Sequence, residues 1–303
     1  MADPIVKWPG GKRQLLDKLV ARCPEEYNKY HEPFFGGGAL FFKLEPESGT
    51  VNDANVRLIN MYKQVRDNVD EVIELLSTYN HPTDDPVSSR EFSDTTRSGD
   101  DIENFYYQQR ELFNCRPNGE KYDEVEEAAL LLYLNRTCYN GVYRENSDGE
   151  FNTPIGGYDH PQWLQETALV EASDVLRNVE IQCGDYSYIA DAGGSDDLVY
   201  FDPPYSQRSG HDYTGSAWSQ DDQEHLISIM QEISEKGARV ILSNSGDMVN
   251  RYFDAGFHVS ETKADRYINQ DGDGRNQSFS EVIATSFPPK EWRDGRQAEL
   301  TDF

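Results

Sequence analysis

The segment that most constrains the fold runs from residue 197 to residue 205 and reads Asp-Leu-Val-Tyr-Phe-Asp-Pro-Pro-Tyr. Four consecutive apolar residues between acidic residues and prolines predict a short strand buried on both faces, as in a parallel α/β sheet. Pro203 ends this strand, because prolines fix φ and lack an N–H. The segment then presents the Asp202 carboxylate, Pro204 and the Tyr205 ring at the carboxyl edge of the sheet, where open α/β folds bind their ligands.

A rigid acidic strand end of this kind could activate an aromatic amine. The amine lone pair is delocalised into its ring until acceptors hold the amine hydrogens, and Asp202 and the Pro203 carbonyl would supply those acceptors. They would also stabilise the positive charge that develops on the nitrogen as it attacks a sulfonium methyl donor. Tyr205 would stack on the base. Asp-Pro-Pro is also a common strand-ending turn, so this pattern alone does not separate catalysis from structure.

A second pattern predicts a cofactor pocket. Residues 30–42 read Tyr-His-Glu-Pro-Phe-Phe-Gly-Gly-Gly-Ala-Leu-Phe-Phe, the strand, glycine turn and helix layout of a nucleotide-type site. Glycine lets the backbone approach a ligand closely, so we expect Phe35, Gly36 and Gly38 to line the pocket. The spacing is not G-x-G-x-x-G and does not indicate a dinucleotide.

Two charged residues are expected to join this pocket. Asp53 follows the short strand 50–51, where an acid would hydrogen-bond a ribose, although residues 52–55 could equally cap the next helix. Lys12 is expected in the first turn of an amphipathic helix that a Gly-Gly turn opens. A cation there opposes the helix dipole, so we expect an anionic partner for Lys12; the alternative is a snorkelling surface lysine.

Residues 59–164 interrupt the α/β pattern. We expect helices over 69–76, 102–113 and 122–134 and a polar surface loop over 80–101. The run 134–158 contains Arg136, Tyr139, Asn140, Arg144 and Tyr158 around glycine turns, which suits base-edge hydrogen bonds and stacking, or else an ordinary β-hairpin with a polar face.

The sheet pattern resumes after residue 164. We expect strands over 179–183, 239–244 and 279–285, a helix over 219–237 and a loop over 267–277. The sequence therefore predicts one domain from residues 1–58 and 165–303, with residues 59–164 as an inserted domain.

The charge balance is unusual. With 28 Lys and Arg against 55 Asp and Glu, the net charge is −27, and the acids are spread along the chain. This composition is similar to that of proteins from salt-accumulating halophiles, and an ordinary acidic cytosolic protein is the alternative. The four cysteines form no C-x-x-C pair and the six histidines show no ligand spacing, so we expect no disulfide and no metal. Without a membrane-length apolar run or a signal-peptide pattern, a soluble cytoplasmic protein is expected.

Together, these motifs resemble those of the Dam-type DNA adenine methyltransferases. The resemblance rests on the triple-glycine turn and on three acidic residues expected at strand ends, Asp53, Asp185 and Asp202. It rests also on Lys-Trp-Pro-Gly-Gly-Lys at 7–12, Asn-Arg-x-x-Tyr-Asn-Gly at 135–141, Phe-Asn-x-Pro at 151–154 and Asp-Pro-Pro-Tyr at 202–205. It covers residues 7 to about 285. It implies a Rossmann-like α/β sheet with helices on both faces, which binds S-adenosylmethionine, and an inserted, mainly helical target-recognition domain.

The resemblance also implies roles for individual residues. Trp8, Lys12, Asp53 and Asp202 match S-adenosylmethionine contacts, and Asp185 matches the residue that meets the cofactor's adenine. Residues 202–205 would receive a flipped-out adenine, since a paired and stacked amine cannot reach the methyl donor. The positions that match DNA contacts are the wedge Tyr139, the base-reading or base-contacting Asn140, Val142, Arg144 and Pro154, and the backbone contact Tyr158.

The implied function is methyl transfer from S-adenosylmethionine to the N6 amine of adenine in double-stranded DNA, within a GATC-like site, with a cognate restriction endonuclease as a candidate partner. Gly157, Asp159 and His160 replace basic phosphate contacts of the relatives, whereas Arg144 is retained. The alternatives are an amine methyltransferase that acts on cytosine, RNA or a protein glutamine, and a non-catalytic DNA-binding relative. Near molar salt, counterion release adds little to DNA affinity, so recognition would rest on base hydrogen bonds, stacking and shape. The net charge of −27 leads us to expect activity that rises with KCl up to molar levels.

Overall fold

The computed structural model describes residues 2–8, 10, 12, 15–87, 102–115, 123–204, 218–265 and 278–289. Its centre is a seven-stranded sheet in the order β3-β2-β1-β4-β5-β7-β6. The strands are β1 (Tyr30–Glu32), β2 (Gly49–Asp53), β3 (Glu180–Cys183), β4 (Leu198–Phe201), β5 (Arg239–Ser245), β6 (His258–Asp265) and β7 (Ser278–Thr285). The first five are parallel, and β7 is antiparallel to both β5 and β6.

The predicted Rossmann-like α/β class is confirmed. The apolar run before Asp202 forms β4, and all four of its residues are buried between β1 and β5. From β1 the chain moves outward to β2 and β3, and from β4 it moves outward the other way to β5. The carboxyl ends of β1 and β4 therefore flank the topological switch point, where such sheets bind ligands.

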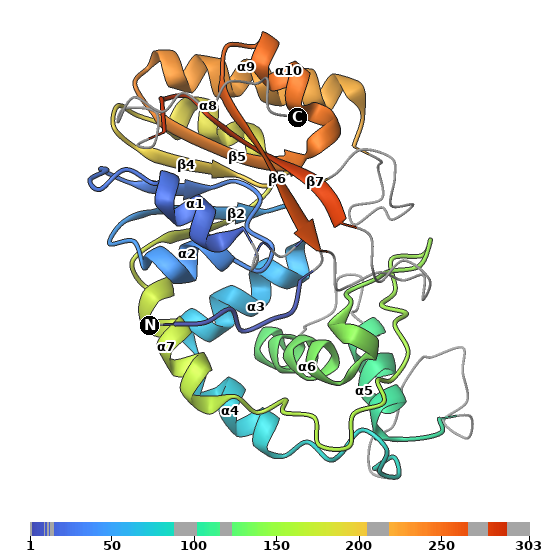
Figure 1. Ribbon diagram of the computed structural model, residues 1–303. Coiled ribbons are helices and arrows are strands. Elements are labelled where there is room, and N and C mark those ends of the chain that lie inside the picture. Colours follow the sequence, from blue (N-terminus) through green and yellow to red (C-terminus); the bar gives the residue numbers. More distant parts are fainter. Residues whose placement is uncertain are drawn as a thin grey trace.

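Helices cover both faces of the sheet (Figure 1). Along β4, Leu198 and Tyr200 join one buried cluster while Val199 and Phe201 join the other, as the alternation of a strand requires. The first cluster is covered by α1 (Leu16–Arg22), α2 (Ala39–Leu44), α3 (Val56–Asp67) and α7 (Glu166–Leu176). The second is covered by α8 (Ile189–Ala192), α9 (Gln220–Glu235) and α10 (Val249–Asp254).

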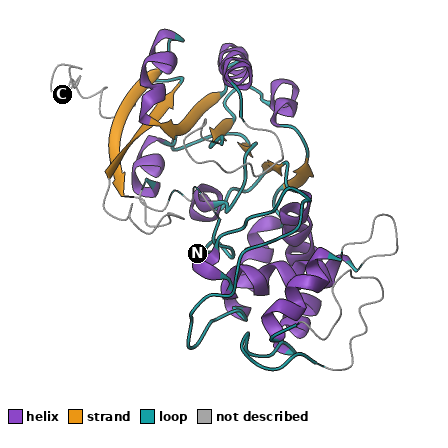
Figure 2. Cartoon of the chain, turned by 90° about the vertical axis from the view of Figure 1, so that its right-hand side faces the viewer, coloured by secondary structure: helices purple, strands orange, loops and turns teal. Residues whose placement is uncertain are grey.

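A helical part lies beside the sheet (Figure 2). It contains α4 (Val69–Ser77), α5 (Phe105–Asn114) and α6 (Glu124–Thr137), and α6 packs against α3, α4 and α5. Because α6 is surrounded, all its residues from Glu127 to Asn135 are buried, and the stretch from Ala128 to Leu134 is apolar apart from the Tyr133 hydroxyl. Helix α3 contacts both β2 and α6, so the boundary that we predicted at residue 59 falls inside a helix shared by the two parts.

Two details differ from the sequence prediction. Helix α1 begins at Leu16, so Lys12 lies before it and not in its first turn. Strand β6 was not predicted, because its sequence His-Val-Ser-Glu-Thr-Lys-Ala-Asp is polar, as suits the edge of a sheet. The predicted loop 267–277 lies outside the described residues. Within the described ranges, no helix is long and apolar enough to cross a membrane.

Candidate active site

The glycine turn joins β1 to α2 at the switch point. Gly36 and Gly38 have φ of 47° and 63°, and Gly38 is the residue before the first turn of α2. A β-carbon on Gly38 would lie 2.7 Å from the Phe35 ring. The Phe35 N–H donates to Asn52 O at 2.8 Å, which ties the turn to the end of β2. Glycine at position 38 is therefore required both by the backbone and by the ring beneath it.

Asp53, the last residue of β2, holds the glycine turn from the side. Its Oδ2 accepts from Gly36 N at 2.8 Å and its Oδ1 from Asn55 N at 2.8 Å. Asn55, not Asp53, caps α3, since its side chain accepts from Arg57 N and Leu58 N. The pKa of Asp53 is raised by burial, although these N–H donors oppose the shift.

Asp202 follows β4 and faces Lys12. Lys12 Nζ lies 2.8 Å from Asp202 Oδ1, with the side chains 6% and 20% exposed, so Lys12 has the anionic partner that was expected. Ser243 Oγ donates to the same oxygen at 3.1 Å. Burial raises the pKa of Asp202, while Lys12 and Ser243 act in the opposite direction. Pro203 is buried and Pro204 exposed; Tyr205 lies outside the described residues.

Glu32 is a fourth acidic strand end that the prediction omitted. It ends β1, is 2% exposed, and accepts a hydrogen bond from Tyr30 OH at 2.7 Å. Burial raises the pKa of Glu32 well above its ordinary value, and the negative charges of Asp202 and Asp53 raise it further. The signal was present, since Glu32-Pro33 repeats the acid-proline pattern of residues 202–203 at the end of the neighbouring strand.

Asp185 lies at the end of β3, at the same edge of the sheet. Its exposed side chain accepts from Ser187 N at 2.8 Å and so caps a short 3-10 helix. Nearby, Asn52 Nδ2 donates to Pro33 O and to Gly184 O, both at 3.0 Å. This one amide ties the ends of β1, β2 and β3 together, so the predicted acidic strand ends do share one edge.

Trp8 lies against the glycine turn and the inserted segment at once. A β-carbon on Gly36 would lie 3.0 Å from Trp8 Cδ1, and one on Gly37 would lie 3.2 Å from Trp8 Cβ. The other side of the indole stacks on Tyr143, with ring centroids 4.9 Å apart and planes 27° from parallel. Trp8 is half-buried, so it is both a wall of the turn and a bridge to residues 134–158.

The predicted DNA-contact segment, residues 134–158, begins in the last turn of α6 and then folds back on itself. Two isolated antiparallel bridges, Cys138 with Ile155 and Glu145 with Phe151, give it a hairpin-like path without a regular strand. The predicted contacts on it differ in exposure. Tyr139 is 46% exposed and Pro154 is exposed, Asn140, Arg144 and Tyr158 are half-buried, and Val142 is buried.

Two arginines of this region have protein partners. Arg144 Nε donates to Asn152 Oδ1 at 2.6 Å, which fixes its guanidinium on the segment. Arg136 donates to Ile5 O at 2.6 and 3.2 Å and to Pro4 O at 3.5 Å, so its predicted place among the DNA contacts competes with a role in holding the N-terminal residues. Tyr158 packs against Lys7, whose Nζ lies 5.1 Å from the ring centroid.

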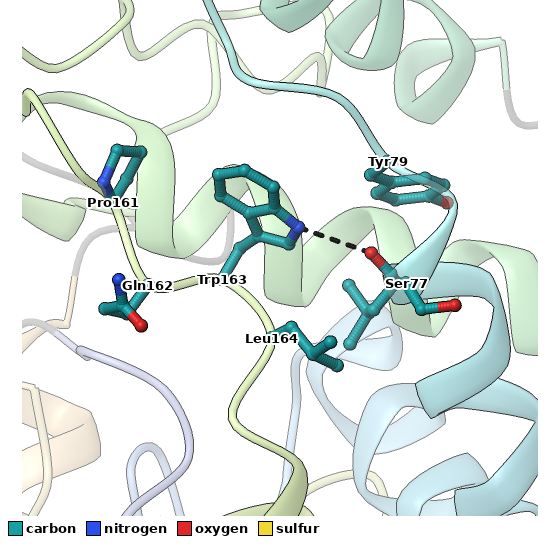
Figure 3. Close-up of a pocket in the computed structure, with 7 residues that line it drawn as sticks. Ser77, Tyr79, Pro161, Gln162, Trp163 and Leu164 are labelled. Atoms are coloured by element: carbon teal, nitrogen blue, oxygen red, sulfur yellow. Dashed lines mark hydrogen bonds between the residues drawn. The ribbon is translucent and has the colours of Figure 1, made fainter.

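Within the described ranges, no cluster of three or more His, Cys, Asp or Glu side chains is placed to hold a metal ion. A hollow of about 220 Å³ lies in the helical part, between the end of α4 and residues 161–164 (Figure 3). Two residues that line it are joined by a hydrogen bond, which Trp163 Nε1 donates to Leu76 O at 3.3 Å. The hollow is lined by none of the predicted site residues.

Residues 8–268 match the family of D12 class N6 adenine-specific DNA methyltransferases. A type II methyltransferase, M.MjaIII, of Methanocaldococcus jannaschii is 36% identical over 299 residues, which are 94% of this chain and 99% of that protein. The type II methyltransferase M1.LlaDCHI of Lactococcus lactis is 36% identical over 290 residues, 94% and 95% of the two chains. The DNA adenine methylase of Escherichia coli (strain K12) is 31% identical over 291 residues, again 94% and 95%. With this match and this sheet, the chain belongs to the D12 class of N6 adenine-specific DNA methyltransferases.

Proposed function

We propose that the methyl donor of this DNA adenine methyltransferase is S-adenosylmethionine and that it binds at the carboxyl edge of β1 to β4. The observation that carries the proposal is the acidity of this edge, where the carboxyl group of Glu32 feels the charges of Asp53 and Asp202, and only Asp202 is paired with Lys12 among these three. Burial raises the pKa of Glu32 and the negative charges of Asp202 and Asp53 raise it further. A cation at this edge would relieve that repulsion, and S-adenosylmethionine carries a sulfonium.

The residues of the edge suit the other parts of such a donor. Both oxygens of Asp53 accept backbone N–H groups, but a carboxylate has about four acceptor positions, so Asp53 can also accept from a ribose hydroxyl. Asp185 is exposed one strand away and can accept from the amine of an adenine ring. Trp8, Phe35, Gly36 and Gly38 would bound the pocket.

S-adenosylmethionine, when bound, supplies a methyl group on a sulfonium sulfur that leaves as a thioether. The rest of the chemistry falls on Asp202 and its neighbours. Asp202 would accept a hydrogen of the adenine N6 amine, with the Pro203 carbonyl and Tyr205 completing the acceptor and stacking groups, and would stabilise positive charge on the nitrogen. This role requires an ionised carboxylate. Lys12 and Ser243 oppose the effect of burial on the pKa of Asp202 and so favour that form.

We assign DNA recognition to the inserted segment 59–164. Exposed Tyr139 would fill the space left by the flipped adenine, and Arg144, held by Asn152, would meet a guanine edge in a GATC-like site. Asn140, Val142 and Pro154 would contact bases and Tyr158 the backbone. Flipping costs a few kcal/mol of stacking and pairing, which an aromatic wedge offsets.

One experiment tests the donor. The affinity for S-adenosylmethionine is measured by titration calorimetry for the wild type, for Asp53→Asn and for the control Asp67→Asn. Asp67 lies on α3, is 51% exposed and pairs with Arg66 outside the site. We expect Asp53→Asn to lose at least about tenfold in affinity, the value of one charged hydrogen bond, and the control to lose none. Equal losses in both variants would reject the assignment of Asp53.

A second experiment tests the site. Unmethylated duplex DNA of mixed sequence is incubated with the enzyme and S-adenosylmethionine, and sequencing that detects modified bases maps the methylated adenines. Modification centred on GATC-like sites is expected. Modification confined to an unrelated sequence would reject the proposed recognition site and leave the proposed donor intact.

A further inference from the structure

Residues 2–8, here called the N-terminal strap, connect the sheet to the inserted segment. The strap passes between the sheet and α6 in Figure 1, where it is the dark blue chain beyond the N label. Ala2 N donates to Glu45 Oε1 at 2.6 Å, just past the end of α2. Farther along, Arg136 holds the Ile5 carbonyl. The strap is therefore fixed to both parts of the molecule along its length.

Asn135, in the last turn of α6, holds the strap most completely. Its Oδ1 accepts from Lys7 N at 2.8 Å, and its Nδ2 donates to Lys7 O at 2.7 Å and to Gly141 O at 3.2 Å. The side chain is 1% exposed, so no water can replace these bonds without rearrangement. One amide thus pairs with both main-chain groups of Lys7 and with the start of the predicted DNA-contact segment.

The contacts of Lys7 and Trp8 extend this link in both directions. A β-carbon on Gly141, whose φ is 67°, would lie 2.4 Å from Lys7 Cδ, so the segment packs directly on the strap. Trp8, the next residue, stacks on Tyr143 and touches Gly36. Tyr143 is 1% exposed and lies between Val142 and Arg144. A continuous set of packed groups therefore joins the glycine turn to the DNA-contact positions.

We infer that Asn135 is a positioning residue that couples donor binding to DNA binding through the strap. The inference rests on the proposed function, which puts the donor at the glycine turn and DNA on the inserted segment. Coupling requires an element that both ligands contact and that each ligand stabilises in one arrangement. Trp8 is the residue that both ligands would contact. Asn135 fixes the position of Trp8, because it hydrogen-bonds both main-chain groups of Lys7, the residue before it. Without Asn135, the strap loses both hydrogen bonds at Lys7. The ordering of Trp8 by one ligand then no longer strengthens the binding of the other ligand.

The test measures the affinity of the protein for S-adenosylhomocysteine, which lacks the transferred methyl group and cannot react. The affinity is measured without DNA and with a saturating concentration of duplex DNA of mixed sequence, made by polymerase amplification. We expect the duplex to tighten binding to the wild type about fivefold or more, and to change binding to Asn135→Ala less than about twofold. Asn135→Asp keeps the acceptor for Lys7 N and loses the donors, so it should give an intermediate factor. It also serves if Asn135→Ala does not fold.

The matched control is Asn114→Ala. Asn114 makes the same two-bond clamp on a main chain, accepting from Phe151 N at 2.9 Å and donating to Phe151 O at 3.0 Å, but it does not touch the strap. We expect this variant to lose stability and keep the wild-type coupling factor. Steady-state kinetics give a second measurement of the coupling. At saturating DNA, Asn135→Ala should raise the KM for the donor and leave kcat nearly unchanged.

Three results would overturn the inference. They are a wild type in which the duplex does not change the donor affinity, an Asn135→Asp or Asn135→Ala protein with the full wild-type factor, and an Asn114→Ala protein that loses the factor equally. A wild type that binds no S-adenosylhomocysteine, with DNA or without it, would overturn the proposed donor as well. That result separates the failure of the proposed function from the failure of the coupling.

Discussion

Asp202→Asn separates the chemistry of the site from its structure. Asparagine has the shape of the wild-type side chain and keeps an oxygen that can accept from Ser243 Oγ, now 3.1 Å from Asp202 Oδ1. The change removes the negative charge and the ion pair with Lys12. It therefore tests whether the carboxylate itself is needed to hold the amine and to stabilise charge on its nitrogen.

The expected loss of activity follows from the electrostatic role. Removing one preorganised group that stabilises a developing charge costs about 10²–10³ in kcat, or about 2.7–4 kcal/mol. Donor affinity should also fall, because Asp202 is one of the acids of the edge that would bind the sulfonium. It should fall less than kcat, because the charge on the amine nitrogen develops only in the transition state.

Two effects on stability oppose each other. Breaking a buried ion pair by removing one partner costs about 3–5 kcal/mol when the other charge stays unpaired. Here Gly10 O still accepts from Lys12 Nζ at 2.9 Å. In addition, burial raises the pKa of Asp202, so the wild-type carboxylate is itself unfavourable at neutral pH. We expect the free energy of unfolding to fall by less than about 2 kcal/mol.

The assay is transfer of labelled methyl groups to unmethylated duplex DNA, together with urea unfolding of each protein. Asp197→Asn is the matched control, because Asp197 lies at the opposite, amino end of the same strand. One oxygen of Asp197 accepts from Gly194 N at 2.8 Å and the other from Lys29 N at 3.1 Å. In Asp197→Asn, the side-chain NH2 group would therefore face one of these two N–H donors. The control should lose about 1–3 kcal/mol of stability and keep its kcat.

The contrast between the two variants decides the matter. If Asp202→Asn kept more than about one tenth of the wild-type kcat, the carboxylate would not be the group that activates the amine. If Asp197→Asn lost activity as severely while still folded, the effect at position 202 would reflect the strand and not the chemistry.

Three further outcomes are expected. For Glu32→Gln, the raised pKa of Glu32 means that wild-type stability falls as pH rises from about 4 through the folded pKa. Urea unfolding should therefore show the variant about equal to the wild type near pH 4 and more stable than the wild type at pH 8. Gly38→Ala should lose at least about 1–2 kcal/mol in unfolding free energy and weaken donor binding, because a β-carbon there meets the Phe35 ring at 2.7 Å in a left-handed backbone. With a net charge of −27, both stability and methyl transfer should rise as KCl increases from about 0.05 M to about 1 M, where the Debye length is about 3 Å, and a maximum near 0.05 M would contradict this.

The sheet was predictable because each strand carries its own local signal. Buried apolar runs predicted β4 and β5, and shorter strand patterns beside turn residues predicted β1, β2, β3 and β7, all to within a few residues. The acidic residue at the end of a strand predicted the candidate edge, since parallel strands end on the same side. Strand β6 escaped because its pairing with β7, and not its composition, makes it a strand.

The helical part was predicted in outline. Helices α4, α5 and α6 were expected with ends that shift by up to a few residues, and α7 was not expected at all. The polar hairpin expected as one alternative for 134–158 is present only as two isolated bridges. Sequence could not decide here, because the same Arg, Asn and Tyr side chains satisfy either a polar hairpin face or a nucleic-acid surface.

The contacts that sequence could not supply are those that join distant parts of the chain. Lys7 and Asn135 lie 128 residues apart, and neither carries a local signal that names the other. The motif of residues 7–12 was predicted to serve one site, yet the structure divides it: Lys7 packs against Tyr158, Trp8 stacks on Tyr143, and Lys12 reaches Asp202. A six-residue segment that contacts both the acidic edge and the inserted segment can transmit order between them only if its register is fixed. That requirement makes a buried amide at position 135, with three main-chain hydrogen bonds, more informative about coupling than any charged residue nearby.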